Sequence, residues 1–179
     1  MRASGRGSVF YFAYGANLHP GWLRRRVQAA VVIGTAELPG HRIEFRKRGR
    51  DGSGKSDACP TGLASDRLPG ALYRLSRADL QRLGAAEAGY HLDEITVESA
   101  QGALAVLTWR ADPAQLVAGL APWSWYLALL RAGAAIHGLP VSHRRWLESV
   151  VSAPDPDCDR AAIALEVMAA WDRNSVASS

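Results

Sequence analysis

The first two thirds of the chain carry the pattern of short β-strands. Apolar runs rich in β-branched and aromatic residues, bounded by Gly, Pro or polar residues, are typical of buried strands. Such runs occupy residues 9–14, 31–34, 43–45, 69–75, 95–97 and 103–109. One helix interrupts them, because Ser76 is a suitable N-cap and Leu80 and Leu83 share one helical face. We expect this helix to end near Glu87, before Gly89.

The last third changes to helical periodicity. A helix is predicted to begin at Ser124 and to end before Gly138, because apolar positions recur there at the spacing of one helical face. That face holds Tyr126, Leu129, Leu130, Gly133 and Ala134. Further helices are predicted over 142–150 and 161–171, separated by the proline-containing stretch 153–157. The chain therefore predicts a mixed α/β (α+β) fold, a curved sheet or small β-barrel with surrounding helices.

Length and composition indicate one globular domain. Of 179 residues, 48% are hydrophobic and 21% charged, which excludes a wholly disordered chain. We expect a flexible N-terminus (1–8), a folded domain (9–152) and a C-terminal helix with a frayed tail (153–179). The sequence shows neither a secretory h-region nor a run of about 20 apolar residues, and Cys59 and Cys158 suit reduced thiols. A cytoplasmic location without membrane contact is the expectation.

The segment 14–18, Tyr-Gly-Ala-Asn-Leu, lies where the first strand ends. Gly15 can adopt dihedrals closed to other residues, and the N–H groups after it can converge on one anion. Such a turn suits a carboxylate or a developing oxyanion. The alternative is a plain strand-to-helix turn in which Asn17 caps a helix over 20–27. The pattern alone favours this second interpretation.

Glu87 is the candidate acid–base group. The other residues of 83–89 carry no charge, so Glu87 has no local ion partner. If its side chain faces inward, desolvation raises its pKa toward the range in which a carboxylate both accepts and donates protons. An exposed glutamate near a helix end is the alternative and the commoner case. The competing acids Asp93, Glu94 and Glu98 lie in an alternating segment typical of a strand with one solvent-facing side.

Basic residues gather in one part of the chain. They are Arg42, Arg46, Lys47, Arg48, Arg50 and Lys55. The stretch 46–60 has no hydrophobic period and predicts a long loop or hairpin, which in a compact domain is commonly functional or mobile. We favour a solvated or substrate-lining loop over a nucleic-acid surface, because the stretch holds no aromatic residue for base stacking and the net charge is only +4.

Several common chemistries find no support in the sequence. The five histidines show no metal-ligand spacing, and no serine stands in a nucleophile-elbow motif. Cys59 precedes a proline and has no nearby histidine, so it is a poor nucleophile. Residues 52–56 lack the first glycine of a phosphate loop, and no helix-forming run follows them. Neither a metal nor a cofactor is expected.

Four segments in order resemble the γ-glutamylcyclotransferase-like family. Residues 10–18, Phe-Tyr-Phe-Ala-Tyr-Gly-Ala-Asn-Leu, are similar to the family signature Tyr-Phe-Ala-Tyr-Gly-Ser-Asn-Leu. Residues 69–73 resemble its Gly-x-x-Tyr strand, and residues 83–90 its Leu-Asp-x-x-Glu-Gly-x-x-Tyr segment. Residues 126–140 resemble its C-terminal Tyr-Leu, Gly-Ala and Gly-Leu-Pro helix. The resemblance covers most of the chain, from about residue 9 to residue 150.

This resemblance implies a fold, a reaction and a site. Members of the family cyclise a γ-glutamyl group to 5-oxoproline by acyl transfer to the substrate's own α-amine, and they release an amine or amino acid. The chemistry needs no enzyme nucleophile, metal or cofactor. Glu87 is implied as the proton shuttle. The implied substrate-binding residues are Tyr14, Gly15, Ala16, Asn17 and Leu18, with Tyr90 and Tyr126 as further candidates.

Three departures from the family pattern keep alternatives open. Ala16 stands in place of Ser, Gly84 in place of Asp, and Ala88 in place of Gly. They fit either an altered substrate choice or a non-catalytic small-ligand-binding member of the same fold. The released group is equally open, being an amino acid, an amine or an acylated natural-product intermediate. An RNA-binding protein and a structural protein have less support, and pairing with a second copy of the chain is left open.

Overall fold

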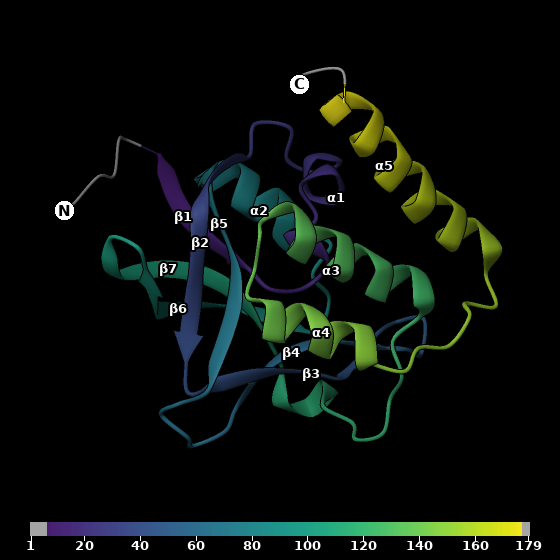
Figure 1. Ribbon diagram of the computed structural model, residues 1–179, viewed down its shortest axis with the longest axis horizontal. Helices are drawn as coiled ribbons and strands as arrows, with labels where there is room; N and C mark the ends of the chain where they lie inside the picture. The colour runs from purple at the N-terminus through teal and green to yellow at the C-terminus, as the bar shows by residue number, and fades with distance from the viewer. Residues whose placement is uncertain (1–6, 177–179) are drawn as a thin grey trace.

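Five strands close into a barrel in this computed structural model, which describes residues 7–176 (Figure 1). The barrel strands are β1 (Ser8–Ala13), β2 (Val31–Pro39), β5 (Arg67–Ser76), β6 (Tyr90–Ser99) and β7 (Gly102–Ala111). Their order is β1-β5-β2-β6-β7, and a parallel pair between Tyr11 and Leu107 joins β7 back to β1. The expectation of a small barrel with surrounding helices is confirmed.

The basic stretch forms a separate two-stranded hairpin. Strand β3 (His41–Arg48) pairs with β4 (Gly54–Pro60) in antiparallel register. Ile43 and Phe45 alternate with exposed or half-buried residues and turn their side chains into the core. The hairpin contacts β5 and β7 of the barrel. Of the two forms that the sequence left open for residues 46–60, the structure therefore has the hairpin.

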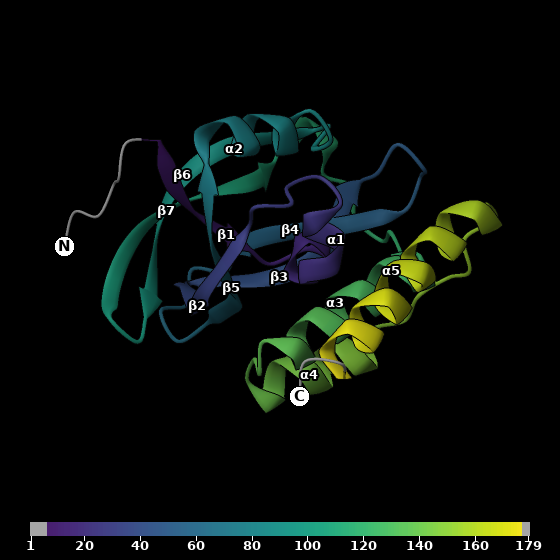
Figure 2. The ribbon, with the colours of Figure 1, turned by 90° about the horizontal axis from the view of Figure 1, so that it is seen from above.

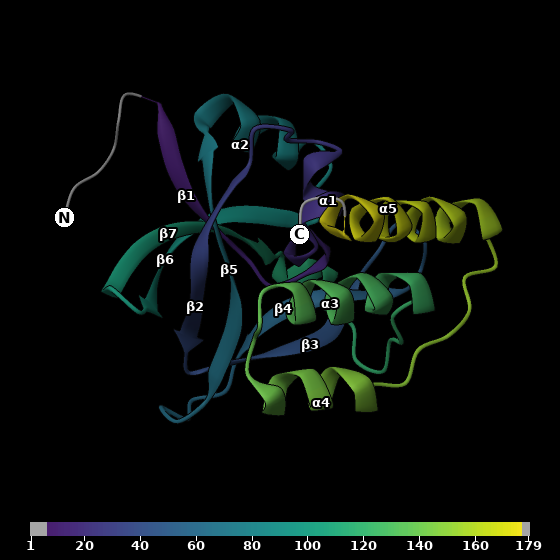
Figure 3. The same cartoon turned by 45° about the horizontal axis from the view of Figure 1, so that its top comes forward.

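The helices cover two sides of the barrel. They are α1 (Pro20–Arg24), α2 (Arg77–Gly84), α3 (Ser124–Ile136), α4 (Val141–Ser149) and α5 (Cys158–Val176), with short 3₁₀ helices η1 (Ala16–Leu18) and η2 (Pro113–Gln115). Figure 2 shows α3, α4 and α5 gathered on one side and α2 on the opposite side. Helix α5 lies beside both α1 and α3 (Figure 3). The predicted apolar face of α3 is buried.

Two helix ends differ from the sequence prediction. Asn17 does not cap α1. Instead the Nδ1 of His19 accepts a hydrogen bond from the Trp22 amide at 3.3 Å, because the Asn17 side chain makes long-range contacts. Helix α2 is capped by Ser76 as predicted but ends at Gly84, before Glu87. The residues that follow form tight turns that lead the chain into β6.

The first strand begins earlier, and the last helix ends later, than the sequence predicts. Ser8 already belongs to β1, and residues 1–6 of the expected flexible N-terminus lie outside the described residues. Asn174 still belongs to α5, while residues 177–179 of the expected tail lie outside the described part. In the described chain, Cys59 is buried, Cys158 is exposed, and both are free thiols. Among the described helices, none combines the length and apolar character needed to cross a membrane.

Candidate active site

A cavity of about 410 Å³ lies where β1 ends, between the β3–β4 hairpin, the α2–β6 connection and α3. Seven of the eight residues singled out from the sequence line it: Tyr14, Gly15, Ala16, Asn17, Glu87, Tyr90 and Tyr126. Leu18 is the exception. Its side chain is packed in the core, and its carbonyl accepts a hydrogen bond from the Tyr73 hydroxyl at 3.2 Å. Residues 70 positions apart in the sequence thus meet around one space.

The centre of the cavity is a contact between Asn17 and Glu87. The Asn17 Nδ2 donates to Glu87 Oε1 at 2.9 Å and also to the Tyr11 hydroxyl at 3.1 Å. Glu87 is held by its own backbone, because its amide donates to the Gly84 carbonyl and its carbonyl accepts from the Tyr90 amide. The carboxylate therefore has a fixed position inside the cavity rather than the solvent-exposed one that the sequence left open.

Burial controls the protonation of Glu87. Its side chain is 16% exposed, and desolvation raises its pKa above the ordinary glutamate value. The hydrogen bond from Asn17 and the charges of Arg26 and Lys47 act in the opposite direction and are weaker. The nearest ion contact is Arg26, whose Nη1 lies 3.9 Å from Oε1. A glutamate without charged sequence neighbours thus acquires distant polar partners.

The segment after β1 brings backbone amides to the cavity. Gly15 has a φ of −103° and a ψ of −147°, so it does not use the positive φ that favours glycine. The constraint is space, since a Cβ on Gly15 would lie 3.3 Å from the Tyr126 hydroxyl and 3.4 Å from the Ser56 Oγ. The backbone N–H of Ala16 lowers the pKa of that same hydroxyl, against the larger effect of burial. The missing serine hydroxyl at position 16 leaves this backbone donor in place.

Helix α3 fixes this segment from behind. A Cβ on Gly133 would lie 2.7 Å from the carbonyl carbon of Leu18 and 2.8 Å from the His19 nitrogen. Only glycine permits such an approach of the helix to backbone atoms. The turn is held from β7 as well, because the Tyr14 hydroxyl donates to the Trp109 carbonyl at 2.7 Å.

The hydroxyls of Ser56, Tyr90 and Tyr126 lie beside this segment in the cavity. Tyr90 donates to the Ser56 carbonyl at 2.7 Å. Tyr126 donates to the Ser56 Oγ at 2.9 Å and accepts from the Ser56 amide at 3.1 Å. Burial raises the pKa of Tyr126 to about 12 and that of Tyr90 above its ordinary value. Both tyrosines therefore keep their protons near neutral pH and act as hydrogen-bonding groups rather than bases.

A tryptophan accounts for one departure from the family pattern. A Cβ on Gly84 would meet the Trp109 ring at 2.7 Å, so the aspartate common at this position has no room beside that ring. Trp109 itself lines the cavity. Gly84 and Trp109 thus form a matched pair, which places the Trp109 ring in the wall of the cavity.

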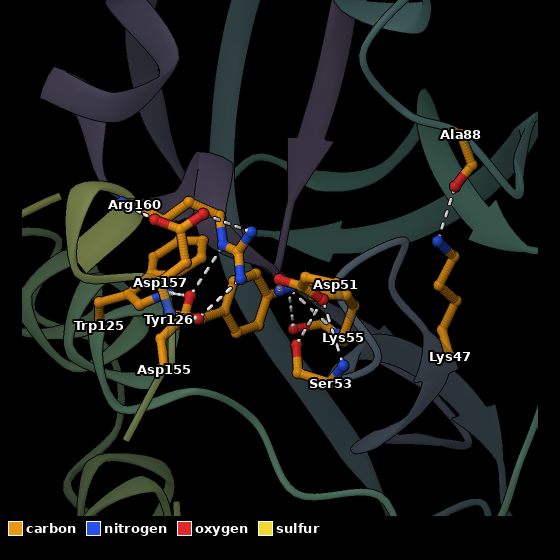
Figure 4. A network of polar contacts seen from close by, with 11 residues as sticks. Lys47, Asp51, Ser53, Lys55, Ala88, Trp125, Tyr126, Asp155, Asp157 and Arg160 are labelled. Carbon is orange, nitrogen blue, oxygen red and sulfur yellow. Dashed lines mark hydrogen bonds and ion pairs between the residues drawn. The ribbon is translucent and has the colours of Figure 1, made fainter. Parts of the chain in front are cut away.

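Aromatic and charged residues that the sequence did not single out complete the cavity. Trp22 and Trp125 line it with ring centroids 5.8 Å apart. Trp125 donates to Asp155 at 2.7 Å, and Asp155 also binds Arg160 of α5, a further lining residue (Figure 4). No local signal could have found Arg160, because only the return of α5 across the molecule brings it to the cavity. Within the described residues, no three His, Cys, Asp or Glu side chains are grouped to hold a metal ion.

The basic residues of the hairpin separate into two groups. Lys47, Arg50 and Lys55 line the cavity, whereas Arg42, Arg46 and Arg48 do not. Arg42 binds Asp66 at 2.7 Å, and Arg46 binds Asp57 at 2.6 Å. Lys55 binds Asp51 at 2.8 Å (Figure 4). Only part of the basic cluster therefore faces the candidate site.

Known proteins resemble the chain in sequence and in structure. No family model matches it. A gamma-glutamylcyclotransferase of Bos taurus is 25% identical over 160 residues, which cover 84% of this chain and 82% of the relative. A solved structure of a gamma-glutamyl cyclotransferase superposes with a TM-score of 0.72 at 20% identity, covering 84% of this chain and 92% of its own.

A second solved structure supports the same fold. An uncharacterised protein from Homo sapiens superposes with a TM-score of 0.72 at 21% identity, covering 83% of this chain and 90% of its own. The likeness to the bovine relative and the shared barrel agree with the four sequence segments. In sequence and in fold, the chain is therefore γ-glutamylcyclotransferase-like.

Proposed function

We propose that the protein cyclises the γ-glutamyl group of a small molecule to 5-oxoproline and releases the attached amine or amino acid. The observation that carries this proposal is the 2.9 Å hydrogen bond between Asn17 and Glu87 inside the cavity. It joins a carboxylate of raised pKa to the segment that supplies backbone donors. The sequence similarity to the bovine gamma-glutamylcyclotransferase supports the same reaction.

Glu87 is the proton carrier in this reaction. Its carboxylate takes a proton from the substrate α-ammonium, and the freed amine forms a bond to the γ-carbonyl carbon. The protonated Glu87 then gives that proton to the departing nitrogen as the old carbon–nitrogen bond breaks. One of the two protons still on the attacking nitrogen follows the same route and the other stays as the lactam N–H. The amine therefore leaves as its ammonium ion, and the enzyme ends unchanged. A pKa closer to neutrality than that of an ordinary glutamate suits a group that must accept and donate in turn.

Donors around the cavity hold the substrate in a folded conformation. The amides of Gly15, Ala16 and Asn17 are assigned to the substrate α-carboxylate and to the oxyanion that develops on the γ-carbonyl oxygen. Tyr90 and Tyr126 are assigned to the walls that orient the substrate. The reaction is intramolecular in solution as well, so the protein's contribution is to hold the flexible substrate in a near-attack conformation.

The test is release of 5-oxoproline from matched isomers. γ-Glutamylalanine should yield 5-oxoproline and alanine, quantified by chromatography. α-Glutamylalanine should yield neither, because its alanine is attached to the other carboxyl. A panel should extend the test to a γ-glutamylamine and to γ-glutamyl-acylated compounds, since the cavity of about 410 Å³ admits more than one released group.

The alternative is a small-ligand-binding member of the same fold. It predicts that calorimetry detects binding of γ-glutamyl compounds while no 5-oxoproline is formed. Binding without turnover across the whole panel would replace the catalytic proposal. Release of 5-oxoproline that depends on Glu87 would exclude this alternative.

A further inference from the structure

The charges around the cavity are unevenly compensated. Lys55 binds Asp51 at 2.8 Å, and Arg160 binds both Asp155 at 2.7 Å and Asp157 at 2.8 Å. Arg26 lies 3.9 Å from Glu87. Each of these three cations therefore has a carboxylate of the protein beside it.

Lys47 and Arg50 are different. Neither has a carboxylate within ion-pair distance in the part of the chain that the structure describes. Both line the cavity, Lys47 from strand β3 and Arg50 from the turn between β3 and β4. Two positive charges without a carboxylate at ion-pair distance among the described residues thus face the space where the substrate is proposed to bind.

Lys47 is buried, which makes its lack of a counter-ion costly. The residue is 4% exposed, and burial lowers the pKa of its ammonium. It donates one hydrogen bond, to the Ala88 carbonyl at 2.6 Å, and lies 4.8 Å from the centroid of the Tyr90 ring. An ammonium has three donors, so two remain without an acceptor among the described residues.

The hairpin register adds to this cost. Lys47 lies directly opposite Lys55 in the antiparallel pair, and like charges at facing positions destabilise a sheet. Burial lowers the pKa of Lys47; the Glu87 charge opposes this from beyond ion-pair distance, and the Lys55 charge adds to it. Both lysines nevertheless line the cavity. A bound anion is the simplest source of compensation.

The position of Lys47 indicates which end of the substrate it contacts. Asn17 reaches Glu87 from the segment after β1, and that segment is assigned to the glutamyl carboxylate. Lys47 reaches the neighbouring residue, Ala88, from the hairpin (Figure 4). Since Glu87 also serves the departing nitrogen, the hairpin wall is left for the released part of the substrate.

We propose that Lys47 and Arg50 select γ-glutamyl substrates whose released part is an acidic amino acid. An amino acid with a neutral side chain brings one carboxylate to this wall, whereas an acidic one brings two, matching the two uncompensated cations. This inference rests on the proposed function and names its substrate class. Charge-assisted hydrogen bonds of this kind are about twice as strong as neutral ones.

The experiment compares two nearly isosteric substrates, γ-glutamylglutamate and γ-glutamylglutamine, at one low ionic strength. Wild-type protein should show a kcat/KM at least about tenfold higher for γ-glutamylglutamate, the ratio that one favourable charged contact supports. Lys47→Met and Arg50→Gln should each bring that ratio toward one. Arg48→Gln is the matched control, because it removes the same charge from an exposed hairpin residue outside the cavity and should preserve the ratio.

The outcomes separate this inference from the proposed function. Equal kcat/KM for the two substrates in wild-type protein would overturn the inference and leave cyclisation standing. No 5-oxoproline from any γ-glutamyl compound would overturn both. Lys47→Met should melt no lower than wild type, because it removes a buried ammonium that lacks a carboxylate. If that variant fails to fold, the test rests on the kcat/KM ratio of Arg50→Gln alone, a change at an exposed residue.

Discussion

At the scale of single residues, the site depends on contacts rather than on unusual backbone geometry. Gly15 has an ordinary negative φ, and its importance lies in the 3.3 Å between its Cβ position and the Tyr126 hydroxyl. The sequence indicated a special glycine but not this contact, because a local pattern carries no information about a tyrosine more than 100 positions away.

Gly15→Val is expected to reduce kcat/KM by about a hundredfold, since a branched side chain would enter the cavity and displace the substrate from the backbone donors. Ala16→Ser, which restores the residue common in the family signature, should stay within about threefold because the backbone donor is unchanged. Kinetics should be measured beside melting temperatures. A stable and fully active Gly15→Val variant would show that the segment does not face the substrate.

Glu87 should also set the acid limb of the pH profile. Its pKa is raised by burial, so the fall of kcat/KM on acidification should have its midpoint above 4.5, the ordinary value for this group. The carboxylate must be unprotonated to accept the first proton, and activity is therefore lost as pH decreases through that midpoint.

Arg26→Gln tests which charges face Glu87. Arg26 and Lys47 both lower the Glu87 pKa, so removing Arg26 should move the midpoint upward, by less than about one pH unit because its side chain is 36% exposed. Arg25→Gln is the control, an exposed arginine that lies over the Trp22 ring. A midpoint that moves equally in both variants would indicate a general charge effect instead of a contact.

At the scale of elements, the approach of α3 to η1 positions the site. The helical pattern predicted the buried face of α3, including Gly133, but not what that face would meet. Gly133 meets the backbone of Leu18 and His19, which cannot move aside as a flexible side chain could. Likewise Asn17 was expected to cap a helix, and the capping residue is His19 because Asn17 is committed to Glu87.

Gly133→Ala therefore tests the sign of a change in the free energy of unfolding. Helix propensity alone would stabilise the protein by about 1 kcal/mol. Overpacking against backbone atoms costs about 1–3 kcal/mol or more, so we expect the free energy of unfolding in urea to fall. Ala135→Gly, on the exposed side of the same helix, should lose about 1 kcal/mol and calibrates the propensity. A more stable Gly133→Ala variant would show that α3 does not approach η1 closely.

At the scale of the whole molecule, the residue pattern predicted most strands and helices and indicated a curved sheet or a small barrel. The apolar runs identify β1 and β5, because runs rich in β-branched and aromatic residues are typical of buried strands. The closure through β7 depends on pairings such as Tyr11 with Leu107, which no local pattern contains. Arg160 reaches the cavity only when the segment before α5 crosses the molecule, and Asp155 in that segment binds both Arg160 and Trp125.

The distribution of charge, too, could be predicted from the sequence only in part. The sequence located a cluster of six basic residues, and the fold assigns three of them to the cavity and the rest to other surfaces. The net charge of +4 gives no hint of this separation. The character of the site therefore follows from the hairpin register and the barrel contacts rather than from composition.

The central claim is that Glu87 carries the proton during cyclisation, and Glu87→Gln tests it most directly. The amide has nearly the same shape and can still accept from Asn17, but it cannot take and return a proton. Glu94→Gln, the same change on an exposed residue of β6, is the matched control. Turnover of a γ-glutamyl substrate and 5-oxoproline affinity should be measured on both variants.

We expect Glu87→Gln to lower kcat by at least about a hundredfold and to change the affinity for 5-oxoproline by less than about threefold. Its melting temperature at neutral pH should be no lower than that of wild type, because a carboxyl with a raised pKa in the folded state favours unfolding when it is ionised. Glu94→Gln should match wild type in all three measurements. Retention by Glu87→Gln of more than about one tenth of the wild-type turnover would contradict the assignment of Glu87 as the proton carrier.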